Sequence, residues 1–221
     1  MSSRLPMFPL GVVLFPGTPL PLHIFEPRYR RMLADCLAGD RRFGILPPGD
    51  VAEMPEPGAV GCVAEVRVNQ PMPDGRSNIV VTGGSRFTLT GVLDEDLPYH
   101  VGLMQLFDDE PGTGPAPADL ERLRELFGEY YAALRQLTDS EPEAADLPDD
   151  PRELSFHIAA ALETDADVKQ RLLAERNTAR RIRALIRLLP GLAASAMSAL
   201  RIHRRAHTNG TGGLRPDILT G

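Results

Sequence analysis

The stretch that decides the fold is residues 7–29, Met-Phe-Pro-Leu-Gly-Val-Val-Leu-Phe-Pro-Gly-Thr-Pro-Leu-Pro-Leu-His-Ile-Phe-Glu-Pro-Arg-Tyr. The apolar run Phe8–Phe15 predicts a strand, and Pro16-Gly17 predicts a turn, because proline fixes φ and glycine tolerates φ > 0. A second strand is expected after the turn, since every second residue from Leu20 to Ile24 is apolar.

A helix is expected to begin at Pro27, where the missing N–H of proline costs no hydrogen bond. The apolar spacing then changes from two to the i, i+3, i+4, i+7 pattern of a helix packed on one side. The residues on this side are Tyr29, Met32, Leu33, Cys36 and Leu37. Gly39 supplies a typical helix end.

The run Phe-Pro-Leu-Gly-x-Val-Leu-Phe-Pro-Gly-x-Pro-Leu-Pro-Leu-x-Ile-Phe-Glu-Pro-Arg-Tyr closely resembles the opening of the N-terminal, substrate-binding domain of Lon-type ATP-dependent proteases. It is most similar to stand-alone bacterial proteins that carry this domain alone. The resemblance implies an α+β fold, a PUA-like pseudo-β-barrel followed by a small α-helical bundle. It also implies recognition of polypeptide substrates.

The residue pattern by itself predicts six or so strands with tight turns, which suggests a small curved sheet or barrel. A long strand from Gly58 to Gln70 should place Val60, Cys62, Ala64, Val66 and Val68 on one face, and Pro71–Gly75 should form a hairpin turn. The other strands are expected at 43–46, 78–82, 87–91 and 99–107, with Gly83-Gly84 interrupting the sheet.

Beyond residue 107 the pattern becomes helical. An exposed linker, Asp108–Pro117, should separate a barrel domain, 1–110, from a helical bundle, 117–206, and a flexible tail, 207–221. Helices are expected at about 119–137, 153–163, 165–176 and 178–189, the last ending at Pro190-Gly191, with a further amphipathic run over 192–203.

The net charge of −6 is unevenly distributed. Residues 108–150 hold 3 basic and 13 acidic side chains, whereas residues 151–206 hold 11 basic and 5 acidic ones. The simplest interpretation is that basic helices pack beside acidic elements of the same bundle; the alternative is a basic surface for an acidic partner or RNA.

Several catalytic and cofactor motifs are missing. The chain has no G-x-x-x-x-G-K-[ST] loop for ATP, and its only lysine, Lys169, lies in a helical pattern instead of beside a catalytic serine. Cys36 and Cys62 fit no zinc motif and are expected to be buried thiols. We therefore expect a non-enzymatic cytoplasmic protein with no metal, cofactor or transmembrane span.

The expected function is binding of an unfolded polypeptide or a specific protein partner, including a role as an adaptor for proteolysis, through exposed apolar groups near the first turn and helix. The candidate residues are Phe15, Pro16, His23, Glu26 and Tyr29. Phe15 and Tyr29 could instead belong to the core, and Glu26 could pair locally with Arg28 or Arg30.

Two other functions are weaker alternatives. PUA-like barrels include RNA-binding modules, and five arginines could form a basic cluster: Arg41, Arg42, Arg67, Arg76 and Arg86. Nucleic acid is still not the expected partner, because the barrel half is net −2 and phosphate binding needs positive charge. No catalytic constellation favours a small-molecule enzyme.

Overall fold

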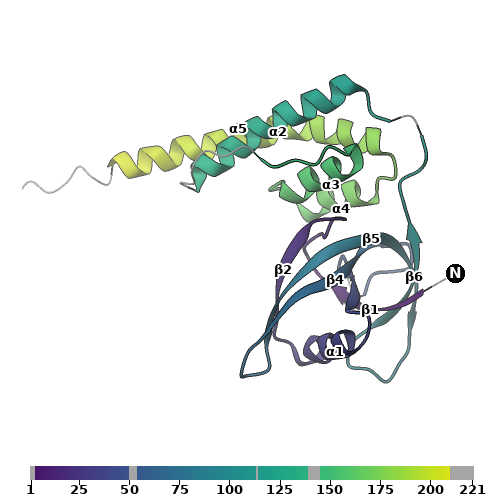
Figure 1. The fold of residues 1–221 in the computed structure, drawn as a ribbon. Coiled ribbons are helices and arrows are strands. Elements are labelled where there is room, and N and C mark those ends of the chain that lie inside the picture. The colour runs from purple at the N-terminus through teal and green to yellow at the C-terminus, as the bar shows by residue number, and fades with distance from the viewer. Residues whose placement is uncertain (1–2, 50–53, 113, 139–144, 210–221) are drawn as a thin grey trace, which may run out of the picture.

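The computed structural model describes residues 3–49, 54–112, 114–138 and 145–209, with the backbone alone given beyond Arg201. It has an α+β fold, with a strand barrel and a helical bundle stacked end to end (Figure 1). The strands are β1 (Ser3–Pro9), β2 (Pro19–Ile24), β3 (Arg42–Leu46), β4 (Val60–Pro71), β5 (Ser77–Leu93) and β6 (Val101–Phe107). The helices are α1 (Pro27–Ala38), α2 (Pro117–Leu137), α3 (Pro151–Ala161), α4 (Ala166–Ala174) and α5 (Thr178–Asn209).

The long strand β5 closes the barrel. The strand order is β2-β5-β4-β3-β1-β6, and an additional β5–β6 pairing returns the sheet to itself. Residues 77–82 of β5 pair with β2 and residues 86–93 pair with β6, while β4 lies on the other side of both halves. The expected barrel is therefore confirmed, and β2 is left as an edge strand beside it.

The first strand lies earlier than the sequence predicted. The expected strand Phe8–Phe15 is wrong, since β1 ends at Pro9 and residues 10–15 form no strand. The last hydrogen bond of the β1–β3 pairing runs from the Leu10 N–H to the Leu46 carbonyl at 2.9 Å. Pro9 and Gly11, on either side of Leu10, end the strand there. Leu14 and Phe15 are nevertheless buried, because the loop folds back on the barrel.

The expected interruption at Gly83-Gly84 is also wrong, because β5 runs through both glycines. The Gly83 carbonyl accepts a hydrogen bond of 2.8 Å from the Gly17 N–H, and its own N–H donates to the Thr18 carbonyl at 3.0 Å. A Cβ at Gly83 would lie 2.0 Å from the Phe15 carbonyl oxygen. This glycine therefore lets the loop before β2 lie against β5.

Two other local predictions have different outcomes. The apolar side of α1 is confirmed, with Tyr29, Met32, Leu33 and Cys36 all buried. In β4, however, Val68 is 43% exposed, although the alternation placed it on the same face as Val66, which is buried. A register shift between Val66 and Val68 changes which side of the sheet the later residues face.

Helix α5 is much longer than predicted. The expected end at Pro190-Gly191 is wrong, since the helix continues through Pro190 to Asn209. Leu189 and Ala193, on either side of the proline, are both buried, and α5 lies along α2 (Figure 1). Packing against α2 therefore maintains the helix across the missing hydrogen bond. The first residues of the expected flexible tail, 207–209, belong to α5, and residues 210–221 lie outside the described part.

The same helix meets a criterion for membrane spans. Thr178–Arg201 is the one segment in the described part of the chain whose length and mean hydropathy would allow it to cross a membrane. Its apolar side chains Ile182, Leu185 and Leu189 are fully buried in the core. Only 28% of this segment is buried, and a single helix of this length and hydropathy is weak evidence of a membrane span.

The basic helices do pack beside acidic elements. Arg183 of α5 pairs with Asp119 of α2 at 3.1 Å, and Arg152 of α3 pairs with Asp108 at 2.5 Å. Basic side chains of residues 151–206 therefore pair with acidic side chains of residues 108–150 within the same molecule.

Asp109, in the expected linker, connects the barrel to the bundle. Its carboxylate accepts hydrogen bonds from Arg86 of β5 and from Arg181 of α5, whose guanidinium groups are fully buried, and from the Thr178 hydroxyl. The Arg181 guanidinium carbon also lies 3.9 Å from the centre of the Phe156 ring. We call Asp109, Arg86, Arg181 and Thr178 the Asp109 cluster.

The surroundings of Asp109 affect its pKa in two opposite ways. Burial opposes ionisation of the Asp109 carboxyl group. The hydrogen bonds from Arg181 and Thr178 and the positive charges of both arginines nevertheless hold the pKa of Asp109 below its usual value.

Candidate functional site

A groove of about 560 Å³ lies on the barrel between β2 and the segment that follows β1. Leu20, Leu22 and His23 line it from β2, and Leu10 and Val12 line it from the opposite segment. The start of α1 borders one part of the groove, because the chain passes directly from β2 into this helix. Most of the lining side chains are apolar.

Aromatic rings form the buried part of the groove. The Phe8 ring centre lies 4.2 Å from that of Tyr29 and 5.9 Å from that of Phe43. Phe8 and Tyr29 are only 7% and 4% exposed, and the Arg28 guanidinium carbon lies 4.6 Å from the Tyr29 ring centre. These rings fix the shape of the groove, since each is packed on more than one side.

Two apolar side chains at the groove are open to solvent. Phe25 is 57% exposed and Val12 is 47% exposed. The Phe25 ring stacks on the His23 ring at 5.9 Å, and His23 Nδ1 shares a hydrogen bond of 2.7 Å with Asn78 Oδ1 of β5. The Phe25 ring is thus oriented by a neighbour while most of its surface remains available to a ligand.

The groove also carries a local ion pair. Arg28 Nε donates to Glu26 Oε2 at 3.0 Å, and Arg28 Nη2 lies 2.9 Å from the same oxygen. Glu26 occupies the N-cap position of α1, but its side chain makes no capping hydrogen bond. This agrees with the interpretation of local pairing, and it leaves the polar edge of the groove nearly neutral.

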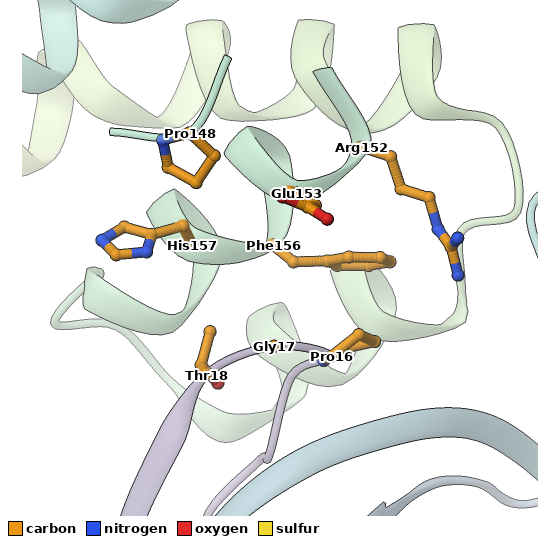
Figure 2. Close-up of a pocket in the computed structure, with 8 residues that line it drawn as sticks. All are labelled: Pro16, Gly17, Thr18, Pro148, Arg152, Glu153, Phe156 and His157. Atoms are coloured by element: carbon orange, nitrogen blue, oxygen red, sulfur yellow. The ribbon is translucent and has the colours of Figure 1, made fainter. Parts of the chain in front are cut away.

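The five candidate residues from the sequence fall into two places. His23, Glu26 and Tyr29 line the groove, whereas Phe15 is fully buried with its ring centre 6.2 Å from that of Phe156 in α3. Pro16 lies in a different pocket, of about 380 Å³, where barrel and bundle meet. Figure 2 shows this second pocket, with Phe156 facing the Pro16 turn.

The sequence pattern did not indicate Phe25 and Val12 as site residues. Both lie inside the quoted stretch, but neither fits its alternation: Val12 follows the end of β1, and Phe25 follows the end of β2. A large apolar residue that directly follows a strand and precedes a helix-starting proline was the available signal for Phe25.

The thiols and the possible metal ligands of the described part give no sign of an activated cysteine or a metal site. Burial raises the pKa of both Cys36 and Cys62 to about 12, so neither thiol is activated. No group of three or more His, Cys, Asp or Glu side chains placed to hold a metal ion occurs among the described residues. Lys169, the only lysine of the sequence, donates to the Ala160 carbonyl at 2.8 Å, so its ammonium group is engaged with the backbone.

The five arginines considered for RNA binding do not form one open cluster. Arg42, Arg67 and Arg76 each pair with an acidic side chain two residues earlier, at 2.6–2.9 Å. Arg41 Nε donates to the Val66 carbonyl, and the Arg86 side chain is fully buried in the Asp109 cluster. This arrangement gives no support to the RNA alternative.

The chain is similar to proteins of one family. Residues 4–190 match the family model described as the ATP-dependent protease La (LON) substrate-binding domain. A Lon protease of Xanthomonas oryzae is 30% identical over 199 residues, which cover 85% of this chain and 23% of that protein. A Lon protease of Solibacter usitatus is 26% identical over 178 residues, which cover 78% of this chain and 22% of that protein. The chain thus spans about a quarter of the length of these relatives.

Two solved structures share the fold. One is a Lon N-terminal domain protein from Xanthomonas campestris, with a TM-score of 0.63 and 22% identity, over 83% of this chain and 97% of that one. The other is the N-terminal domain of a Lon protease from the Mycobacterium avium complex, with a TM-score of 0.61 and 16% identity, over 85% and 98%.

Proposed function

We propose that this chain, which belongs to the Lon substrate-binding domain family, binds segments of unfolded or partner polypeptides in the groove beside β2. The observation that carries the proposal is the exposed Phe25 ring at the edge of an apolar groove with a rigid aromatic interior. An exposed apolar patch bordered by polar groups is typical of protein-binding surfaces.

The free energy available from the exposed part of the groove favours weak binding with a short lifetime. Covering an exposed Phe contributes at most about 1.5–3 kcal/mol, so one groove of this size would release its ligand readily. The local Glu26–Arg28 pair leaves little net charge to select acidic or basic segments. We therefore expect recognition of apolar side chains over charged ones.

The test is binding of a labelled unfolded protein. Fluorescein-labelled lactalbumin, reduced and carboxymethylated so that it stays unfolded, should show a saturable rise in anisotropy when the chain is added. Phe25→Ser should weaken this binding by about tenfold, because it removes an exposed ring at the groove. The native, disulfide-bonded form of the same protein should not bind.

Val92→Ser is the matched control, since Val92 is 44% exposed on β5 and does not line the groove. It should leave the affinity unchanged. Equal losses in both variants would argue for non-specific apolar adhesion, and no binding of the unfolded protein would refute the proposed function. Thermal melts should show that both variants remain folded.

The proposal extends to proteolysis as a second step. The matched relatives are named Lon proteases, and we propose that a bound polypeptide, the client, is passed to such an enzyme in the cytoplasm. Free thiols such as Cys36 and Cys62 persist in that compartment. Adding the chain to a Lon protease of the same organism should change the rate of client degradation. Phe25→Ser should reduce this effect in proportion to its weaker binding.

A further inference from the structure

The groove runs along the edge of β2 and not over one of its faces. Successive residues of a strand point to opposite faces of the sheet. Leu20, Pro21, Leu22 and His23 are consecutive, and all four line the groove. A hollow lined from both faces of one strand must lie at the edge of that strand.

The backbone register shows which groups face this edge. The Thr18 carbonyl accepts from the Gly83 N–H of β5 at 3.0 Å, so the backbone of Thr18 points toward β5. Along an antiparallel strand this direction alternates from residue to residue. The backbones of Leu20, Leu22 and Ile24 therefore also point toward β5, and those of Pro19, Pro21 and His23 point away from it.

The open edge is consequently rich in acceptors and poor in donors. Pro19 and Pro21 have no N–H, so His23 supplies the only outward N–H among these three residues, beside three outward carbonyl oxygens. In the described part of the chain, no backbone N–H outside the strand ladders donates to those carbonyls.

The partial charges of this edge select its occupant. A row of carbonyl oxygens is complementary to a partner that offers backbone N–H groups at every second residue. A second copy of β2 is a poor partner, because it too lacks two of its outward donors. An extended, proline-free segment of another polypeptide can supply them, and its apolar side chains can cover Phe25 and Val12.

We propose that the groove binds an extended apolar segment alongside β2, with alternate N–H groups of the segment donating to the carbonyls of Pro21 and His23, the two outward-facing residues that line the groove. This inference rests on the proposed function and adds the conformation and hydrogen-bonding pattern of the ligand. Proline, or any residue without an N–H, is excluded at alternate positions of the bound segment.

The experiment uses a synthetic nine-residue peptide in which Leu, Val and Phe alternate with Ser and Thr. In a series of variants, each backbone amide in turn is replaced by an ester, which removes one N–H and keeps the shape. Replacement at the donating positions should weaken binding by about fivefold, and replacement at the positions between them by less than about twofold. The losses should therefore alternate along the peptide.

Hydrogen exchange locates the peptide on the chain. The His23 amide faces the open edge, and its exchange, followed by NMR, should slow when the unmodified peptide binds. The Ile24 amide already faces β5 and should exchange at the same rate with and without peptide. This residue is the internal control.

The outcomes separate the two proposals. Ester effects without alternation, or an unprotected His23 amide, would overturn the edge placement even if the unfolded lactalbumin still binds. Failure of the peptide where the unfolded protein binds would overturn it as well. Failure of both ligands would remove the proposed function itself.

Discussion

Gly83 and Gly84 are adjacent in β5, but only one of them has room for a side chain. A Cβ at Gly83 would lie 2.0 Å from the Phe15 carbonyl oxygen, whereas a Cβ at Gly84 would make ordinary contacts at 3.5 Å or more. Gly83→Ala should therefore lower the free energy of unfolding by about 1–3 kcal/mol, the usual cost of overpacking. Urea denaturation followed by circular dichroism measures the change.

Gly84→Ala is the control in the same strand. It should leave stability unchanged or raise it slightly, because alanine loses less conformational freedom on folding than glycine. If the two variants were equally stable, the loop before β2 would not be pressed against β5 at Gly83. The position of the groove wall would then be in question.

At the scale of single elements, α5 contains an internal proline that the sequence predicted to be its end. Pro190 is exposed and lies between two buried residues of the helix, Leu189 and Ala193. Pro190→Ala should raise the free energy of unfolding by about 1–3 kcal/mol, since alanine restores the hydrogen bond and removes the ring from the helix interior. Thermal unfolding provides the measurement.

Pro151 begins α3, and its replacement is the matched comparison. Pro151→Ala should change stability little, because the first residue of a helix needs no N–H partner. A similar gain in both variants would point to a general effect of removing proline. No gain from Pro190→Ala would indicate that the helix had already adapted fully around the ring.

Elements with a clear period were predictable from the sequence, and those that depend on distant packing were not. The helical spacing in residues 27–38 and the alternation in 19–24 both identified real elements. The continuity of β5 through Gly83 depends on the approach of Phe15, and that of α5 through Pro190 depends on α2. Neither contact can be predicted from the local propensity of the residues in β5 or α5.

The candidate site follows the same division. The position of His23, Glu26 and Tyr29 near one another followed from their closeness in the chain. The separation of Phe15 from them did not, because it is set by contact with Phe156, far along the sequence. Phe25 was missed because exposure of a single ring has no periodic signal.

At the scale of the whole molecule, the Asp109 cluster holds the barrel and bundle together. Asp109→Ala would leave the fully buried guanidinium groups of Arg86 and Arg181 without their carboxylate. The free energy of unfolding should fall by about 3–5 kcal/mol, as is usual when one partner of a buried ion pair is removed. Urea denaturation would show the loss.

The neighbouring residue provides a control. The Asp108 side chain is 72% exposed where it pairs with Arg152, and exposed pairs contribute about 0–1 kcal/mol. Asp108→Ala should therefore be nearly neutral. Equal effects at both positions would mean that Asp109 is not the residue that connects the two parts.

Acid should weaken this connection in a defined range of pH. The folded pKa of Asp109 is lower than its usual value of about 3.9, so the unfolded chain takes up a proton first as the pH falls. The stabilisation by the carboxylate is then complete above about pH 5 and is lost as the pH falls through 4 toward the folded pKa.

The difference in stability between the natural chain and Asp109→Asn should accordingly be constant from pH 7 to about pH 5 and shrink below pH 4. Thr178→Val removes the hydroxyl that donates to the same carboxylate and accepts from Arg181 Nη2, and it gives a milder variant if Asp109→Asn does not fold. Asp108→Asn supplies the baseline for an exposed pair. A difference that stayed constant down to pH 3 would mean that the Asp109 carboxylate is not selectively stabilised in its charged form, and that hydrogen bonds to the Leu173 and Glu175 carbonyls hold the buried arginines instead.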